Sequence, residues 1–146
     1  MNNRQKNEKY ASLMDKLKKS IRNEFYYEAI FIEYAILEDR TESLLRHAKL
    51  KTKGPDEKNL SLAMKLKNIC NSPNFKKPYI SKNLTSELLC SVNKWKVKRN
   101  ILIHDLIRCP YKDEQVRNIA EEGYEIVKKM NSKSTMVNKF LDTMNN

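Results

Sequence analysis

Glycine and proline are so rare in this chain that most of it can run as helix. The 146 residues include two glycines and four prolines, the residues that interrupt helices most strongly. The commonest residues are mostly helix-tolerant ones, lysine, leucine, glutamate, isoleucine and asparagine. We therefore expect an all-α protein, a single-domain bundle of four or five helices over residues 1–146. Its core would lie in about 5–130, and the tail, 131–146, would be a short helix or flexible.

Apolar residues recur at three- and four-residue steps along five segments of the sequence. The helices that this spacing predicts are Gln5 to Lys19, Arg22 to Leu50, Asp56 to Asn71, Asn83 to Arg108 and Asp113 to Met130. Gly54 and Pro55 end the second helix, Asn83 is the expected N-cap of the fourth, and Pro110 sets its end. The stretch "NSPNFKKPYISK", residues 71–82, contains two prolines and is predicted to be a loop.

The chain is strongly basic and lacks the features of a membrane protein. Its formal net charge of +11 favours polyanions such as nucleic acid or an acidic membrane surface. The longest apolar stretch, Ala29 to Leu37, is too short to span a bilayer and contains Glu33. Met1 is not followed by the pattern of a secretion signal. We expect a cytoplasmic protein that is not inserted in a membrane.

The three cysteines do not form a recognisable disulfide or metal pattern. Cys70, Cys90 and Cys109 are odd in number, widely spaced and without a CxxC pair. This arrangement predicts buried thiols in a reducing compartment rather than disulfides or a zinc site. We expect neither a metal ion nor another cofactor.

The stretch "KRNILIHDLIR", Lys98 to Arg108, places Arg99 and His104 in an apolar run. At about 100° per residue, Arg99 lies at the centre of an apolar stripe, within about 60° of Leu88, Val92, Trp95, Leu102 and Leu106. His104 points about 140° away from Arg99 and shares its side with Val97 and Ile101. A helix that is apolar on both sides must be covered on both. This predicts that one side packs in the bundle and the other against a second copy of the chain.

A buried arginine requires a carboxylate partner, and Glu33 is available on the second helix. Glu33 lies within about 40° of Leu37 on the apolar stripe of that helix. It is either a structural counterion of Arg99 or a residue that orients a functional arginine. The alternative is that Arg99 reaches the edge of the bundle or pairs with an acid, and that His104 is a hydrogen-bonded core histidine.

Arg99, Asn100, three further residues and His104 make the pattern RNxxxH, late in a small helical chain. This resembles the signature of the HEPN superfamily (higher eukaryotes and prokaryotes nucleotide-binding domains). That signature is an arginine and a histidine separated by four to six residues, often with a polar residue after the arginine. "FIEYAILEDR" in the second helix is similar to the acidic, aromatic helix that precedes the motif helix in small HEPN toxins and abortive-infection proteins. A second match, Arg40 to His47, lacks the asparagine, and we expect it to be a chance match rather than the motif. Whether Arg40 and His47 contribute to the site stays open.

The resemblance implies a metal-independent endoribonuclease, a toxin or antiphage effector that leaves 2′,3′-cyclic phosphate ends. His104 would exchange protons, Arg99 would grip the scissile phosphate, and Asn100 would orient His104 or donate to the phosphate. Because cleavage needs both a base and an acid, a homodimer formed through this helix would supply two histidines. The implied partners are RNA, a second copy of the chain and an antitoxin, either protein or RNA. Leu106 stands where some HEPN toxins carry a tyrosine that a nucleotidyltransferase antitoxin modifies, so that antitoxin is not inferred.

Two groups of lysines are candidates for binding the RNA backbone. Lys94, Lys96 and Lys98 flank the motif, and Lys76 and Lys77 lie in the 71–82 loop with Phe75 and Tyr79. Such a patch can track phosphates and stack unpaired bases, or it is a solvated basic loop whose aromatic residues anchor it to the core.

Two other functions fit the same sequence features. The first is a non-catalytic helical module, HEPN-like or unrelated, that binds nucleic acid or a protein. The second is a helical DNA-binding regulator, which is less favoured because no short helix, glycine-containing turn and polar recognition helix follow one another.

Overall fold

The computed structural model describes residues 1–146 and contains six α-helices, one short 3₁₀ helix and no strand beyond an isolated bridge between Lys53 and Asn59. The elements, in chain order, are α1 (Asn3–Arg22), α2 (Tyr26–His47), α3 (Leu62–Asn71), η1 (Pro73–Lys76), α4 (Pro78–Asn83), α5 (Ser86–His104) and α6 (Asp113–Met144). The predicted all-α bundle is confirmed, with more helices than the four or five expected.

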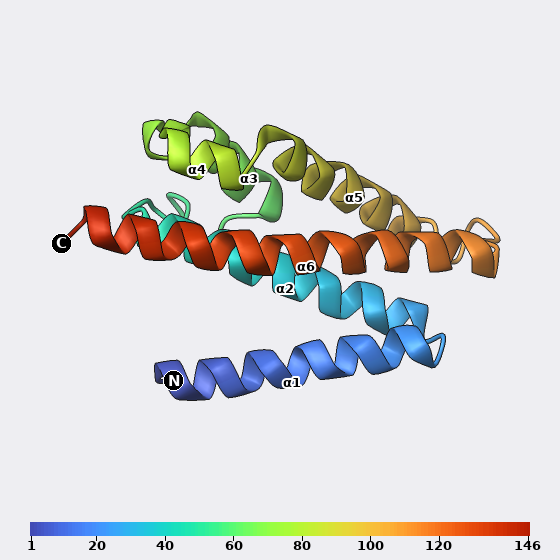
Figure 1. The fold of residues 1–146 in the computed structure, drawn as a ribbon. Coiled ribbons are helices and arrows are strands. Elements are labelled where there is room, and N and C mark those ends of the chain that lie inside the picture. Colours follow the sequence, from blue (N-terminus) through green and yellow to red (C-terminus); the bar gives the residue numbers. More distant parts are fainter.

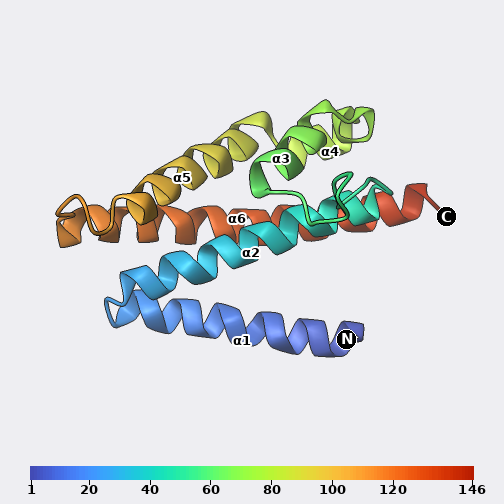
Figure 2. The same ribbon diagram turned by 180° about the vertical axis from the view of Figure 1, so that it is seen from behind.

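The longest helix, α6, is the centre of the bundle (Figure 1). It packs along α2 and also contacts α1, α4 and α5. Figures 1 and 2 show α1 on one side of the α2–α6 pair and α5 on the other, and both chain termini at the same end of the molecule. The bundle therefore has two outer faces, one formed by α1 and one by α5.

The buried stripe of α6 explains why this helix runs as one piece where a helix ending at Met130 and a tail were expected. Buried residues alternate at four- and three-residue steps along the whole helix: Val116, Ala120, Gly123, Val127, Met130, Ser134, Val137 and Leu141. A 3.5-residue repeat keeps one face of a helix against its neighbour over many turns. Gly123 and Ser134 occupy stripe positions, and for that reason the pattern looks interrupted in the sequence.

Trp95 on α5 is the largest fully buried side chain. Its Nε1 atom donates a hydrogen bond to the carbonyl oxygen of Ile119 on α6 over 2.9 Å. Gly123, one turn further along α6, leaves the room that this indole needs, since a Cβ atom there would lie 2.7 Å from Nε1. The glycine thus allows α5 to approach α6 closely.

Several predicted helix ends are wrong, and local backbone chemistry explains them. The second helix begins at Tyr26 rather than Arg22, because Glu24 adopts a positive φ of 63° in the turn after α1. The third begins after Ser61, whose side chain accepts from the backbone of the first turn, rather than at Asp56. The fourth begins after Thr85, which caps it in the same way, and not at Asn83.

The stretch expected to be a loop, 71–82, is largely helical, as η1 followed by α4. Pro73 and Pro78 occupy the first turns of these two elements, where a proline has no hydrogen bond to lose. The prolines start short helices here rather than prevent them.

Two further findings concern the thiols and the membrane. The prediction of buried thiols is wrong, because Cys70, Cys90 and Cys109 are all exposed and free. None of the helices combines the length and the apolar character that crossing a bilayer requires.

Candidate functional site

Arg99 lies half-buried between α5 and α2, where an aromatic ring holds its guanidinium group. Its Cζ atom lies 3.9 Å from the centroid of the Tyr34 ring, which is a cation–π contact. Its Nη1 atom donates to Oδ1 of Asn100 over 3.1 Å, while its buried Nε has no partner. Burial is the largest effect on the pKa of Tyr34 and raises it. The Glu38 carboxylate raises it further, and the positive charge of Arg99 acts in the opposite direction. The ring therefore stays neutral at physiological pH and leaves the charge of Arg99 uncompensated.

The ion pair expected between Glu33 and Arg99 does not form. Glu33 is fully buried, and neither of its carboxyl oxygens has a hydrogen-bond partner. Burial raises its pKa to about 9, so that it is protonated at neutral pH. A neutral acid avoids the free-energy cost of burying a charge, so Glu33 needs no cation beside it. Glu33 is a core residue of α2 beside Gly123, and Arg99 has no carboxylate within ion-pair distance.

His104 is the last residue of α5, and its side chain is exposed. No hydrogen bond joins it to Arg99 or Asn100 within the chain. Exposed aliphatic residues surround it, of which Ile107 is 98% exposed. Val97 and Ile101 share the side of His104, whereas Ile103 lies about 160° around the helix from Ile101. Leu106 and Ile107 follow the end of the helix. We call these five exposed residues at the end of α5 the α5 apolar face. Leu106, expected on the buried stripe with Arg99, is exposed because the helix ends before it. The reading of His104 as a hydrogen-bonded core residue is therefore wrong.

Exposed aromatic residues on α2 adjoin this region, and the sequence analysis did not single them out. Phe31 is 71% exposed and Tyr27 is 52% exposed. Both lie within about 60° of Tyr34 around the helix, and Tyr34 contacts Arg99. The signal was present as a second periodic set on α2, but the longer buried stripe of the same helix obscured it.

The lysines predicted to bind RNA divide into two separate groups. Lys94, Lys96 and Lys98 lie on α5, and only Lys98 is paired, with Glu122 over 2.9 Å. Lys76 and Lys77 precede α5, whose axis runs for about 27 Å between its first residue and His104. Figure 1 shows α4 beyond the far end of α5. These two lysines are therefore not part of the motif site.

The aromatic residues near Lys76 and Lys77 anchor their segment to the bundle. Phe75 is buried, and the Tyr79 ring stacks on Phe140 of α6 with 4.7 Å between centroids. Phe75 is thus covered by protein, whereas Tyr79 is covered on one face and remains 40% exposed. Both residues anchor this segment, and stacking of a base stays a prediction for Tyr79 alone.

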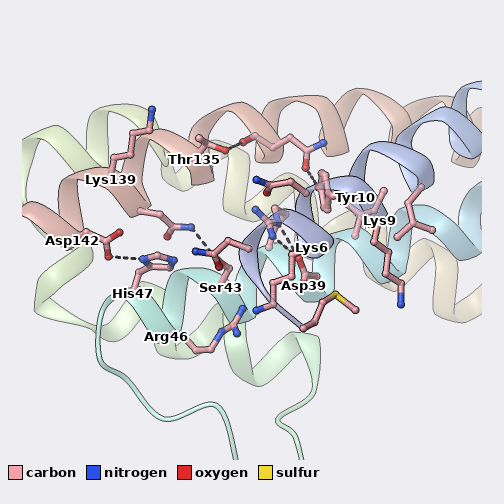
Figure 3. Close-up of a pocket in the computed structure, with 18 of the residues that line it drawn as sticks. Lys6, Lys9, Tyr10, Asp39, Ser43, Arg46, His47, Thr135, Lys139 and Asp142 are labelled. Atoms are coloured by element: carbon pink, nitrogen blue, oxygen red, sulfur yellow. Dashed lines mark hydrogen bonds and ion pairs between the residues drawn. The ribbon is translucent and has the colours of Figure 1, made fainter.

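The second arginine–histidine match lies in a groove between α1, α2 and α6, with a volume of about 1020 Å³ (Figure 3). His47 Nδ1 lies 2.6 Å from Oδ1 of Asp142 on α6. Arg40 donates to Asp39 over 2.6 Å, and its guanidinium carbon lies 4.7 Å from the centroid of the Tyr10 ring on α1. We call this the terminal groove, because it lies at the end of the bundle that holds both chain termini. Nowhere in the chain do three or more His, Cys, Asp or Glu side chains gather in a way that could hold a metal ion.

The fold and the motif site together define an all-helical bundle that presents an arginine without a counterion beside an exposed apolar face. Comparisons with models of protein families, with curated proteins and with solved structures found no match.

Proposed function

We propose that this chain is a metal-independent endoribonuclease of the HEPN type, a toxin or antiphage effector that acts as a homodimer in the cytoplasm. One observation carries the proposal: Arg99 has no carboxylate partner and lies on the helix that ends in an exposed histidine within an uncovered apolar face. A guanidinium without a counterion is ready for a phosphate, and an apolar face is ready for a second subunit.

A homodimer would supply both proton-transfer groups that the cleavage reaction uses. In cleavage, a base removes the proton of the 2′-hydroxyl, O2′ bonds to phosphorus, the bond from phosphorus to O5′ breaks, and an acid protonates O5′. His104 from one subunit would act as the base and His104 from the other as the acid. Arg99, supported by Tyr34, would stabilise the charge on the phosphoryl oxygens, while Asn100 would fix the guanidinium. The products would be a 2′,3′-cyclic phosphate and a 5′-hydroxyl end.

The first prediction concerns cleavage of a labelled RNA by purified protein in excess EDTA. We expect the wild type to cleave, and His104→Ala and Arg99→Ala to lose about 100-fold or more of the rate, since a proton-transfer group contributes about 10²–10⁴-fold. Arg22→Ala is the control for lost charge, because Arg22 is exposed and unpaired at the end of α1. Circular dichroism would verify that each variant is folded.

Three outcomes would contradict this proposal. Cleavage that needs added divalent metal would remove the metal-independent mechanism. Full activity in His104→Ala combined with loss in His47→Ala would move the active site to the terminal groove. Binding of RNA without cleavage by a verified dimer would make the chain a non-catalytic helical module.

A further inference from the structure

We propose that the terminal groove binds a small, multiply charged phosphate ester that also carries a hydroxyl or amino group, which is the chemistry of a nucleotide. The groove is built by α1, α2 and α6, and it uses none of the residues of the motif site. Its α1 wall lies on the opposite side of the α2–α6 pair from α5 (Figures 1 and 2). The inference therefore stands independently of the proposed ribonuclease activity.

The charge of the groove favours an anion with several negative charges. Six cationic side chains line it against two carboxylates, those of Asp39 and Asp142; the cations are Lys6, Lys9, Arg40, Arg46, Lys49 and Lys139. Asp39 is already paired with Arg40, and Asp142 with His47. The other five cations have no carboxylate within ion-pair distance, although α1, α2 with the residues just after it, and α6 bring them together. Phosphate groups are the ligands that such a set of donors attracts.

An unsatisfied polar atom in the wall of the groove indicates that the ligand also donates a hydrogen bond. Asn138 on α6 is 7% exposed, and its Nδ2 atom donates to Oγ of Ser43 on α2 over 3.0 Å. Its Oδ1 atom is buried and has no partner. Native proteins rarely leave such an acceptor unpaired. An ionised phosphate offers only acceptors, so a hydroxyl or amino group of the same ligand would supply the donor for this oxygen.

The groove is also organised before any ligand arrives (Figure 3). Asp142 fixes the His47 ring through Nδ1 and leaves Nε2 free, while Asp39 and the Tyr10 ring hold the Arg40 guanidinium. The volume of about 1020 Å³ is at the upper end of the range of small-molecule sites, about 300–1,000 Å³. The groove thus has room for a nucleotide with its phosphates.

The test is isothermal titration calorimetry of the full chain with two probes, ATP and inorganic tripolyphosphate. We expect both to bind, and the double variant Arg46→Gln with Lys139→Gln to weaken both at least tenfold. The matched control, Arg22→Gln with Lys67→Gln, removes the same charge from exposed, unpaired positions outside the groove and should change binding less than twofold. Asn138→Ala should weaken ATP while leaving tripolyphosphate unchanged, because only ATP offers hydrogen-bond donors.

Each remaining outcome would overturn the proposal. These are no binding of either probe at millimolar concentration, equal weakening by the groove and control variants, and equal binding of ATP by wild type and Asn138→Ala. A fourth titration, with an eight-nucleotide single-stranded RNA, separates the free nucleotide from a strand. Binding of that RNA without ATP would replace the small ligand by a polynucleotide. The double variant of the groove changes two exposed residues, Arg46 and Lys139. The test therefore stays valid even if Asn138→Ala does not fold.

Discussion

At the scale of single residues, Arg99 and Glu33 were expected to form an ion pair, but each lies in a different environment. Arg99 keeps its charge against the Tyr34 ring, whereas Glu33 gives up its charge and stays in the core as a neutral acid. A salt bridge in the core would have hidden the guanidinium from any phosphate. The protonation of Glu33 therefore leaves Arg99 available for a ligand.

Glu33 should make the stability of this protein fall as the pH rises. Its pKa is about 9 in the folded chain, against an ordinary value of 4.5, so the folded state holds a proton that the unfolded state has lost between these values. The stabilising contribution is complete below about 4.5, declines above it, and is gone once the pH passes about 9. In urea unfolding, the wild type should lose stability relative to Glu33→Gln by at most about 1.4 kcal/mol per pH unit in this window.

Glu28→Gln is the control for this measurement, because Glu28 is exposed on the same helix and forms no ion pair. Its free energy of unfolding should follow that of the wild type at every pH. A constant difference between wild type and Glu33→Gln from pH 5 to pH 9 would show that Glu33 is ionised in the folded protein.

At the scale of elements, the close approach of α2, α5 and α6 depends on one position without a side chain. A Cβ atom at residue 123 would lie 2.7 Å from both Cδ of Glu33 and Nε1 of Trp95. Both neighbours are fully buried, so neither can move away freely. The helices must therefore separate if residue 123 gains a methyl group.

Gly123→Ala should lower the free energy of unfolding by about 1–3 kcal/mol through this overpacking, despite the higher helix propensity of alanine. Ser132→Ala on an exposed position of the same helix is the control and should leave stability unchanged or slightly raised. Chemical unfolding followed by circular dichroism measures both. A Gly123→Ala protein as stable as the wild type would mean that α6 has space at this position.

The elements were largely predictable from the sequence because apolar periodicity dominates them. The buried stripe of α5 follows the predicted one as far as Leu102, and Arg99 and His104 point to different sides of α5 as expected. The helix ends were less predictable, because they depend on local events such as the positive φ of Glu24 and the caps at Ser61 and Thr85. The lack of an ion pair at Glu33 could not be predicted either, since protonation depends on a burial that only the packed bundle reveals.

At the scale of the whole molecule, the α5 apolar face is an apolar surface that a single chain leaves uncovered. We expect the wild type, a chain of 17.3 kDa, to show twice that mass in light scattering at micromolar concentration. Ile101→Asp should be a monomer and should lose RNA cleavage, because a buried charge at the interface has no partner. Met64→Asp on α3 is the control, since Met64 is an exposed apolar residue on another face.

Two results would contradict this assignment of the interface. A monomeric wild type with full cleavage activity would remove the need for a composite site. A dimer that survives Ile101→Asp would place the interface elsewhere on the bundle.

Both chain ends emerge at the terminal groove, and Met1 itself lines that groove. A purification tag or a fused reporter at either end would therefore extend from the groove and leave the end of α5 open. Such an extension would disturb ligand titrations before it disturbed assembly. Binding measurements consequently need the tag removed, whereas a fusion used to follow assembly can keep it.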